Sequence, residues 1–343
     1  MNELVVCDVS SMVYVGTFGR KEEFWGYPVG GIHYFLDRMA VAFANRDSVI
    51  LCFDSPSFRN ELYEKYKCGR EKQPIVYSQI ETLYDGLQSC GIRCEKFAGY
   101  EADDIVEWAV AQNVEKYVRG VTIYSNDNDL CHSIRNGVVL RTTNKSMNDI
   151  TAANFEYGIY YGKTIPYNTI SAYKVFCGCQ SDSIPALRIT SGHSGYELFT
   201  IWCRVLGKKY NLAERSVGAN PDAVRIFAKS SGLFTEAEVE EVERRIKLIY
   251  PAECPENVSI QATSWQEVNK DKLAKFLSQY GAKSALYCLN LKGTGLTESD
   301  KEMLRNKTRA LCTGAYAADR NMEFNTKSVK SKVIDLDAFT KGF

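Results

Sequence analysis

Histidine is scarce in this sequence, and closely paired cysteines are missing. The 343 residues include three histidines, His33, His132 and His193, and none of the twelve cysteines forms a C-x-x-C pair. These residues cannot complete a zinc-finger pattern. Scattered thiols are typical of a reducing compartment rather than of a disulfide framework. The sequence therefore argues against structural zinc and against disulfides.

Long apolar runs and an excess of either charge are also missing. No uncharged apolar stretch reaches the length of a membrane span, and the first residues lack the basic-then-apolar layout of a signal peptide. We therefore expect a soluble, unexported, cytoplasmic protein. The 42 basic and 42 acidic residues give a net charge of +0, which does not indicate a nucleic-acid partner. Clustered carboxylates can, however, cancel a local basic surface in such a total.

Hydrophobic patterning predicts an α/β fold in the first half of the chain. Short apolar runs rich in β-forming residues cover 4–7, 49–53 and 121–124, with weaker runs at 92–94 and 138–140. Between these runs, Ile80, Leu83, Tyr84 and Leu87 repeat at helical spacing. This alternation predicts a largely parallel sheet flanked by helices. A chain of this length is expected to form one large domain or two coupled domains.

Helices dominate the pattern from about residue 165 onward. Thr235 and Glu238 are spaced as a capping box, which marks the start of one of these helices. The last stretch, 325–343, is polar and basic and ends in an apolar–acidic peptide, which predicts a flexible tail. Residues 333–343 space apolar side chains among acids, as peptides that dock on sliding clamps often do. A disordered tail with incidental hydrophobic residues is the plainer interpretation.

Acidic residues follow the predicted strands at the points where these strands end. They are Asp8, Asp54, Glu101, Asp103, Asp104, Asp127 and Asp129. Because the carboxyl ends of parallel strands share one edge of a sheet, we expect several of these side chains to converge there. Converging carboxylates repel one another unless hard cations neutralise them, which predicts magnesium or manganese. Two such ions about 4 Å apart can activate water and stabilise the leaving oxygen of a phosphodiester.

Each acidic residue also has a plainer interpretation. Asp8 alone would be a turn former or a helix N-cap. The group from Glu101 to Asp104 could complement a helix dipole, and Asp127 with Asp129 could form a surface turn. The metal-site interpretation is favoured because the plainer one would have to hold independently at every strand end.

Basic and aromatic residues alternate directly after Asp54. The segment 59–70 contains Arg59, Tyr63, Lys65, Tyr66, Lys67 and Arg70. In such a segment the cations can hold phosphates while tyrosines stack on unpaired bases. A solvated helix face would give a similar pattern, so the segment alone does not decide between the two.

Four motifs follow one another over roughly residues 1–190. They are Phe53-Asp54 with Ser57-Phe58-Arg59 and Tyr66-Lys67-x-Gly69-Arg70, then Gly99-Tyr100-Glu101-Ala102-Asp103-Asp104-Ile105, then Ser125-x-Asp127-x-Asp129-Leu130, and finally Ser181-Asp182-Ser183-Ile184-Pro185. In order and spacing they resemble the 5′ nucleases: flap endonucleases, the 5′-nuclease domain of bacterial DNA polymerase I, and phage 5′-exonucleases. Residues 28–32 resemble the helix start behind the family's first aspartate. Residues 233–258 more faintly resemble the C-terminal domain of the T-even phage RNase H.

The resemblance implies a PIN-like fold and a reaction. The expected domains are a catalytic α/β domain over 1–165 with a helical arch near 55–75, and a helical C-terminal domain over 166–325 with a helix–turn–helix DNA-binding element. A flexible tail would cover 326–343. The implied activity is that of a metal-dependent 5′-3′ exonuclease or flap endonuclease, which hydrolyses DNA phosphodiesters near 5′ ends by a two-metal mechanism and needs no histidine base.

The resemblance also implies roles for particular residues. Two magnesium ions, which manganese can replace, would be held by Asp8, Asp54, Glu101, Asp103, Asp104, Asp127, Asp129 and Asp182. Lys67 and Arg70 match basic residues that contact the scissile phosphate, with Arg59 in support, while Lys65 has no secure counterpart. Candidate DNA contacts are Tyr66, Arg188, His193, Lys208 and Lys209.

The sequence departs from the family pattern at two places. Cys179 stands where the family usually has an aspartate, and a neutral thiol is a poor ligand for a hard cation. We therefore expect a weakened second metal site built by Asp127, Asp129 and Asp182. The loop after Pro185 lacks the family's glycine-rich hairpin, which grips duplex DNA with the help of a monovalent cation. Arg188, Gly192 and His193 would form a modified version.

Three functions remain open at this point. The first is an active 5′ nuclease, acting as a monomer on DNA with a 5′ end or flap, or on RNA primers in RNA–DNA hybrids. The second is a non-cleaving scaffold that binds branched nucleic acid. The third is a PIN-type RNase, which the segment 59–70 argues against. A phage source would place the protein in the host cytoplasm.

Overall fold

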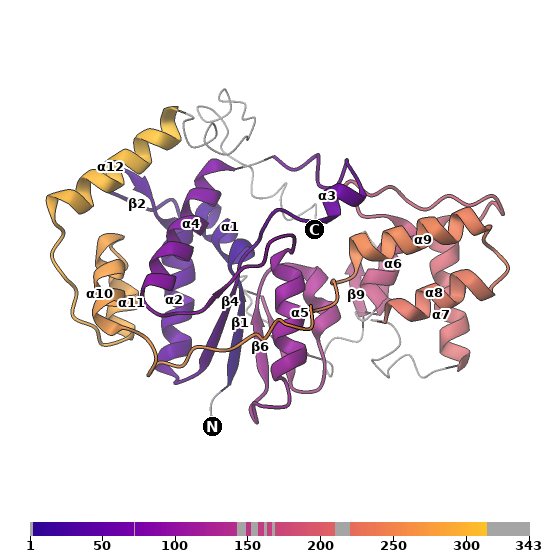
Figure 1. Cartoon of the computed structure of the whole chain (residues 1–343), viewed down its shortest axis with the longest axis horizontal. Helices are drawn as coiled ribbons and strands as arrows, with labels where there is room; N and C mark the ends of the chain where they lie inside the picture. Colours follow the sequence, from indigo (N-terminus) through magenta and orange to yellow (C-terminus); the bar gives the residue numbers. More distant parts are fainter. Residues whose placement is uncertain are drawn as a thin grey trace.

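The computed structural model describes residues 3–71, 73–142, 149–151, 157–160, 163–166, 169–209 and 220–313. The molecule is elongated, with a twisted sheet in its middle (Figure 1). Helices α10–α12 lie at one end, and α7–α9 lie at the other. In the described residues, no helix is long and apolar enough to cross a bilayer.

The central sheet has six strands in the order β5-β4-β1-β6-β7-β8. Their bounds are β1 Leu4–Asp8, β4 Ser48–Cys52, β5 Cys94–Glu95, β6 Val121–Tyr124, β7 Val138–Arg141 and β8 Asp149–Ile150. All neighbouring strands are parallel except β7 and the edge strand β8. The predicted mostly parallel sheet flanked by helices is confirmed. The carboxyl ends of β1, β4 and β6 meet at one edge, because these strands are direct neighbours.

Side chains of β1 and β4 alternate between two separate hydrophobic cores. Val5 and Val49 face one core, whereas Val6 and Ile50 face the other. Both faces are therefore covered by helices, as expected for a parallel sheet whose strands are apolar throughout.

One face of the sheet is covered by helices from both ends of the chain. These helices are α1 Val9–Gly19, α2 Gly30–Ala44, α4 Pro74–Ser89, α10 Lys270–Gln279, α11 Lys283–Cys288 and α12 Glu298–Thr313. A short hairpin, β2 Glu23–Phe24 with β3 Tyr27–Pro28, joins α1 to α2. Helices α1 and α2 can approach closely because Gly31 has no Cβ. A Cβ at this position would lie 2.5 Å from the Thr17 hydroxyl oxygen and 2.7 Å from the Val13 carbonyl oxygen.

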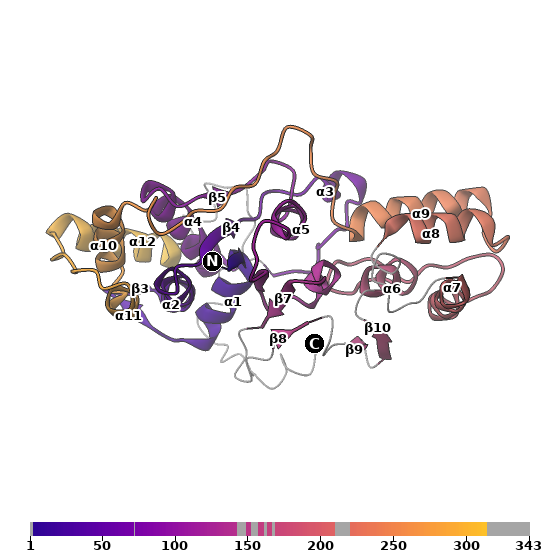
Figure 2. The same cartoon turned by 90° about the horizontal axis from the view of Figure 1, so that it is seen from below.

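The opposite face carries α5 Ala102–Asn113 and the 3₁₀ helix η1 Asn128–Ser133, which contact the sheet. The core on this side continues toward one end of the molecule, where it is formed by α6 Ile170–Cys177, α7 Gly195–Lys209, α8 Pro221–Ser230 and α9 Glu236–Ile249 (Figure 2). The capping box of Thr235 and Glu238 begins α9, as the sequence predicts. A separate two-stranded hairpin pairs β9 Tyr157–Tyr160 with β10 Lys163–Pro166.

The helices after residue 165 share their cores with the sheet rather than forming one body of their own. Helices α6 to α9 pack on the α5 face, and α10 to α12 pack on the α1 face. The extended chain between them crosses the sheet edge, where Thr263 and Val49 exchange backbone hydrogen bonds of 2.9 Å. The C-terminal half therefore shares both hydrophobic cores with the N-terminal sheet, and the division into domains 1–165 and 166–325 stays a prediction.

The segment expected to form a helical arch near 55–75 is mostly turns. It contains one short helix, α3 Arg59–Leu62. Lys67 has a φ of 53°, a left-handed conformation that interrupts an α-helix. The turn is held because the Lys67 backbone N–H donates to the Asp182 carbonyl oxygen at 3.0 Å. The predicted flexible tail, 326–343, and its clamp-docking peptide lie outside the described residues.

Candidate active site

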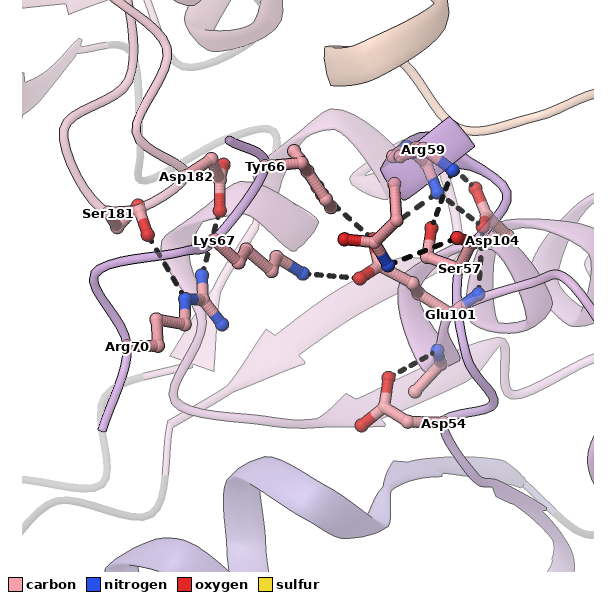
Figure 3. Close-up of polar contacts among 12 residues, drawn as sticks. Asp54, Ser57, Arg59, Tyr66, Lys67, Arg70, Glu101, Asp104, Ser181 and Asp182 are labelled. Atoms are coloured by element: carbon pink, nitrogen blue, oxygen red, sulfur yellow. Dashed lines mark hydrogen bonds and ion pairs between the residues drawn. The ribbon is translucent and has the colours of Figure 1, made fainter. Parts of the chain in front are cut away.

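Carboxylates from three strand ends and one helix start gather at the carboxyl edge of the sheet. Asp8 caps α1: one of its oxygens accepts from the Ser11 N–H at 3.1 Å, and the other accepts from the Ser125 hydroxyl at 2.7 Å. Asp54 accepts from the Ala102 N–H at 2.9 Å, which ties the end of β4 to the start of α5 (Figure 3). The N-cap interpretation of Asp8 was therefore correct in part, since the same acid that caps α1 also lines the edge.

Mutual repulsion shows that four of these carboxylates lie near one another. Burial, followed by the charges of Asp54 and Asp127, raises the pKa of Asp8 to about 7. Burial and the charge of Asp129 raise the pKa of Asp127 to about 6. Burial, followed by the charges of Asp127 and Asp8, raises the pKa of Asp103 well above its ordinary value. We call Asp8, Asp54, Asp103 and Asp127 the primary cluster.

The donor chemistry of the primary cluster fits a hard divalent cation. Its side-chain ligands are carboxylate oxygens, which magnesium and manganese prefer, and a cation would relieve the repulsion that raises their pKa values. Among the described residues, no group of three histidine, cysteine or acidic side chains is close enough to hold an ion in the arrangement seen here. The fit therefore rests on the kind of ligand and on the charge, and the ligand distances would have to shorten on binding.

The raised pKa values predict how this site affects stability in the absence of metal. Asp8 and Asp127 keep their protons in the fold until about pH 7 and about 6, against an ordinary pKa of 3.8. Their contribution to stability is therefore complete below about pH 4 and is lost as the pH rises through 7. In chelator, Asp8→Asn should raise the thermal unfolding midpoint more at pH 7.5 than at pH 5.5, by about 2–4 °C per kcal/mol relieved.

Comparing Asp8→Asn with the wild-type protein isolates this effect from other titrating groups. Burial lowers the pKa of His132, so that residue acts in the opposite direction over the same pH range. Because His132 is present in both proteins, the difference between their midpoints reports the carboxylate. A difference that is the same at both pH values would show that Asp8 does not titrate with a raised pKa.

Asp104 is directed away from the primary cluster and into a buried ion pair. Arg59 donates two hydrogen bonds of 2.8 Å to the two oxygens of Asp104 (Figure 3). Asp104 also accepts from the backbone N–H groups of Ala252 at 2.8 Å and Glu101 at 3.0 Å. Although burial opposes ionisation, the Arg59 guanidinium lowers the pKa of Asp104. Its oxygens are therefore committed to protein donors, and its role as a metal ligand stays a prediction that this geometry does not favour.

Arg59 likewise serves the fold rather than the open edge. Its side chain is 4% exposed, and it donates to the carbonyl oxygens of Leu248 and Tyr250, both at 3.0 Å. These contacts fasten α3 to the end of α9. The support for the scissile phosphate predicted for Arg59 would require these bonds to break.

Glu101 receives donors from the turn-rich segment above the sheet. Lys67 donates to one oxygen at 2.5 Å, and the Tyr66 hydroxyl donates to the other at 2.9 Å (Figure 3). Tyr66 is buried, so in this arrangement it orients Glu101 instead of offering a ring for a base to stack on. Lys67 is half-buried and lies within electrostatic range of Asp103 and Asp127, which places its ammonium beside the primary cluster.

Arg70 and Asp182 connect the same segment to the loop after α6. Arg70 donates to Asp182 at 2.8 Å and to the Ser181 carbonyl oxygen at 3.1 Å. Lys174, on α6, pairs with Asp129 and lies 4.0 Å from Asp182. The sequence interpretation overlooked Lys174; the available signal was a lysine within the otherwise apolar and weakly polar helix Ile170–Cys177, a few residues before Cys179.

The predicted DNA-contact residues outside this centre are spread along the loop and helix that follow. Arg188 is exposed and His193 is half-buried, both in the connection between α6 and α7. These two helices with their 178–194 connection occupy the place of the expected helix–turn–helix element, and its role in binding DNA stays a prediction. The side chains of Lys208 and Lys209 lie outside the described residues.

Comparison with known proteins agrees with this geometry. Residues 3–158 match the family described as "5'-3' exonuclease, N-terminal resolvase-like domain", which confirms the resemblance seen in the motifs. The matched span contains the whole primary cluster, whereas Lys174, Cys179 and Asp182 lie beyond it.

Individual relatives include two with the description "5'-3' exonuclease" and a DNA polymerase I. A 5'-3' exonuclease of Buchnera aphidicola subsp. Schizaphis graminum is 32% identical over 147 residues, which are 42% of this chain and 49% of the relative. DNA polymerase I of Streptococcus pneumoniae is 23% identical over 308 residues, or 87% and 34% of the two chains. A 5'-3' exonuclease of Aquifex aeolicus is 25% identical over 263 residues, or 73% and 88%. The chain thus spans half or less of the length of the first two relatives.

A solved structure shares the fold. The flap endonuclease of bacteriophage T5, in a pseudo-enzyme–product complex with DNA and metal ions, aligns with 90% of this chain and 100% of its own at a TM-score of 0.51. The two are 13% identical, so the likeness concerns the fold. It confirms the expected PIN-like arrangement of sheet and flanking helices.

Proposed function

We propose that this chain, whose residues 3–158 match the model of the 5′-3′ exonuclease N-terminal domain, is a metal-dependent nuclease that hydrolyses phosphodiesters near the 5′ ends of DNA. The observation that carries the proposal is the primary cluster, with its raised pKa values, directly beside Lys67. The repelling carboxylates suit a divalent metal ion, and the Lys67 ammonium beside them suits a phosphate of the substrate.

The protein's own residues would divide the work between metal and phosphate. Asp8, Asp54, Asp103 and Asp127 would hold a divalent cation, preferably magnesium. When bound, this cation would lower the pKa of the attacking water and stabilise charge on the phosphate. Lys67 would exchange its contact with Glu101 for a phosphate oxygen, and Arg70 would do the same from Asp182. Glu101 would hold Lys67 in place until the substrate arrives.

Positioning rather than proton transfer would account for most of the rate enhancement. In-line attack on phosphorus needs aligned groups and neutralised charge, and no histidine belongs to the primary cluster. The His132 ring donates from Nδ1 to the Asp129 carbonyl oxygen, and burial lowers the pKa of this residue.

The substrate proposal is DNA with a free 5′ end or a flap, with RNA primers in RNA–DNA hybrids as a further substrate. A monomer acting in the cytoplasm, or in the host cytoplasm for a phage protein, agrees with these substrates, and docking on a sliding clamp through the tail is part of the same proposal. The competing function is a scaffold that binds branched nucleic acid without cutting. Cys179 favours this alternative, whereas the retained primary cluster and Lys67 favour the nuclease.

Cleavage of a 5′-labelled flap duplex with magnesium tests the proposal. We expect cutting near the junction, and we expect Lys67→Ala to reduce kcat by about 10²-fold, as for loss of one electrostatic contact to the reacting phosphate. Lys65→Ala is the matched control, because Lys65 is exposed two residues earlier and, among the described residues, the hydrogen bond it makes uses its backbone carbonyl oxygen. Binding of the flap without cutting, in magnesium and in manganese, would identify the scaffold instead.

A further inference from the structure

The acidic pair Asp129 and Asp182 is already neutralised by cations of the protein. Lys174 lies on α6, and its ammonium pairs with Asp129 and lies 4.0 Å from Asp182. The Lys174 side chain is 4% exposed, so it is a buried charge and not a surface contact. A buried ammonium is tolerated only where carboxylates compensate it, which makes these two acids its required partners.

Both oxygens of Asp182 are occupied by protein donors. Arg70 donates to one oxygen at 2.8 Å. The Cys179 thiol donates to the other at 2.9 Å. Cys179 is fully buried, and burial raises the pKa of its thiol, so the sulfur stays protonated and acts as the donor. The residue that replaces the family's aspartate therefore adds a hydrogen-bond donor where a further negative charge would attract a metal.

The primary cluster and the pair formed by Asp129 and Asp182 thus differ in charge balance. In the primary cluster the carboxylates raise one another's pKa. At Asp182 the opposite holds: burial opposes ionisation, but Lys174 and Lys67 lower the pKa of the carboxyl below its ordinary value. A second divalent cation would have to displace a buried ammonium and bind beside a neutral thiol, both of which are unfavourable.

We propose that the ammonium of Lys174 takes the place of a second divalent cation, so that the chain binds a single catalytic metal ion, at the primary cluster. This inference rests on the proposed function for the chemistry of that metal. It replaces the expected weakened second metal site with a site closed by the protein itself. Lys174 is a positioning residue, because it acts by pairing with Asp129 and holding it and Asp182 in place rather than by touching the substrate.

Counting bound manganese in the absence of nucleic acid tests the inference separately from activity. Free manganese can be measured by its magnetic-resonance signal during titration of the full chain. We expect one ion per wild-type chain. The double variant Lys174→Met, Cys179→Asp removes the ammonium and restores a carboxylate, and we expect it to bind two ions, the second at least 10-fold more tightly than any second ion bound by the wild type.

Cys179→Asp alone keeps the ammonium and provides a further measurement if the double variant does not fold. We expect Cys179→Asp to bind one ion with the wild-type affinity. Two ions of similar affinity in the wild-type protein, or in Cys179→Asp, would overturn the inference. If the wild type binds two ions and cleaves, the proposed nuclease function is supported and this inference is refuted. If it binds one ion and does not cleave, the inference that Lys174 replaces the second cation is supported and the nuclease function is refuted.

Discussion

Replacing Asp103 with asparagine is expected to reduce kcat for cleavage of a 5′ flap by about 10²–10³-fold, the range found when one preorganised electrostatic group is removed. Asp103 lies within electrostatic range of both Asp8 and Asp127, so it belongs to the group of carboxylates that would hold the metal. Asparagine keeps the size and one acceptor oxygen but removes the charge. Single-turnover cleavage with saturating magnesium measures the effect on the chemical step.

The same substitution should leave the fold intact or stabilise it. Burial and its acidic neighbours raise the pKa of Asp103 well above its ordinary value, so the ionised carboxylate is unfavourable in the metal-free fold. At pH 7.5 in chelator, the unfolding midpoint of Asp103→Asn should equal or exceed that of the wild type. Wild-type cleavage rates, or inactivity accompanied by a lower midpoint, would remove Asp103 from the metal site.

The strands and the convergence of their terminal acids could be predicted from the sequence. Apolar runs such as 49–53 form the buried strands, and parallel neighbours must end at a common edge. Asp8 and Asp54 therefore meet because of local pattern and one general rule of topology. The same rule placed Asp103 and Asp127 at this edge, and their mutual repulsion agrees with that prediction. The four motifs added Asp182.

The direction of individual side chains could not be predicted in this way. Asp103 and Asp104 are adjacent in one motif, yet consecutive residues of a helix point about 100° apart. Asp103 faces the sheet edge, and Asp104 faces Arg59 and the end of α9. The partners that distinguish Asp104, the Arg59 guanidinium and the Ala252 N–H, lie 45 residues before it and 148 residues after it in the chain.

Long-range contacts also explain the two larger differences from expectation. The segment near 55–75 looks like a basic helix, but Arg59 and Tyr66 are buried and Lys67 turns to meet the Asp182 backbone. Helices α10 to α12 look like the continuation of a C-terminal domain, but α10 packs against α4, α11 against α2 and α12 against β3. Neither contact leaves a signal in local periodicity, because both depend on which distant surfaces are complementary.

Replacing Asp104 with alanine is expected to lower the free energy of unfolding by about 3–5 kcal/mol, because it leaves the buried Arg59 guanidinium without its bidentate partner. The Asp104 side chain is 0% exposed, and it also accepts two backbone N–H groups that would lose their acceptor. Urea unfolding followed by circular dichroism measures the change. Glu302→Ala is the control, since its pair with Arg305 is at the surface and should cost no more than about 1 kcal/mol.

A double variant separates loss of an ion pair from loss of packing. In Arg59→Met, Asp104→Leu the charges are removed together, so no uncompensated ion remains in the core, and most of the stability lost in Asp104→Ala should return. Because neither residue is required at the phosphate in this arrangement, that variant should also retain cleavage within about 10-fold of wild type, a small loss beside that of one electrostatic contact to the reacting group. A stable but inactive double variant would instead assign Arg59 or Asp104 to the reaction, as the motif resemblance implied. Stability and activity measured on the same protein thus decide between the structural and the catalytic role of this ion pair.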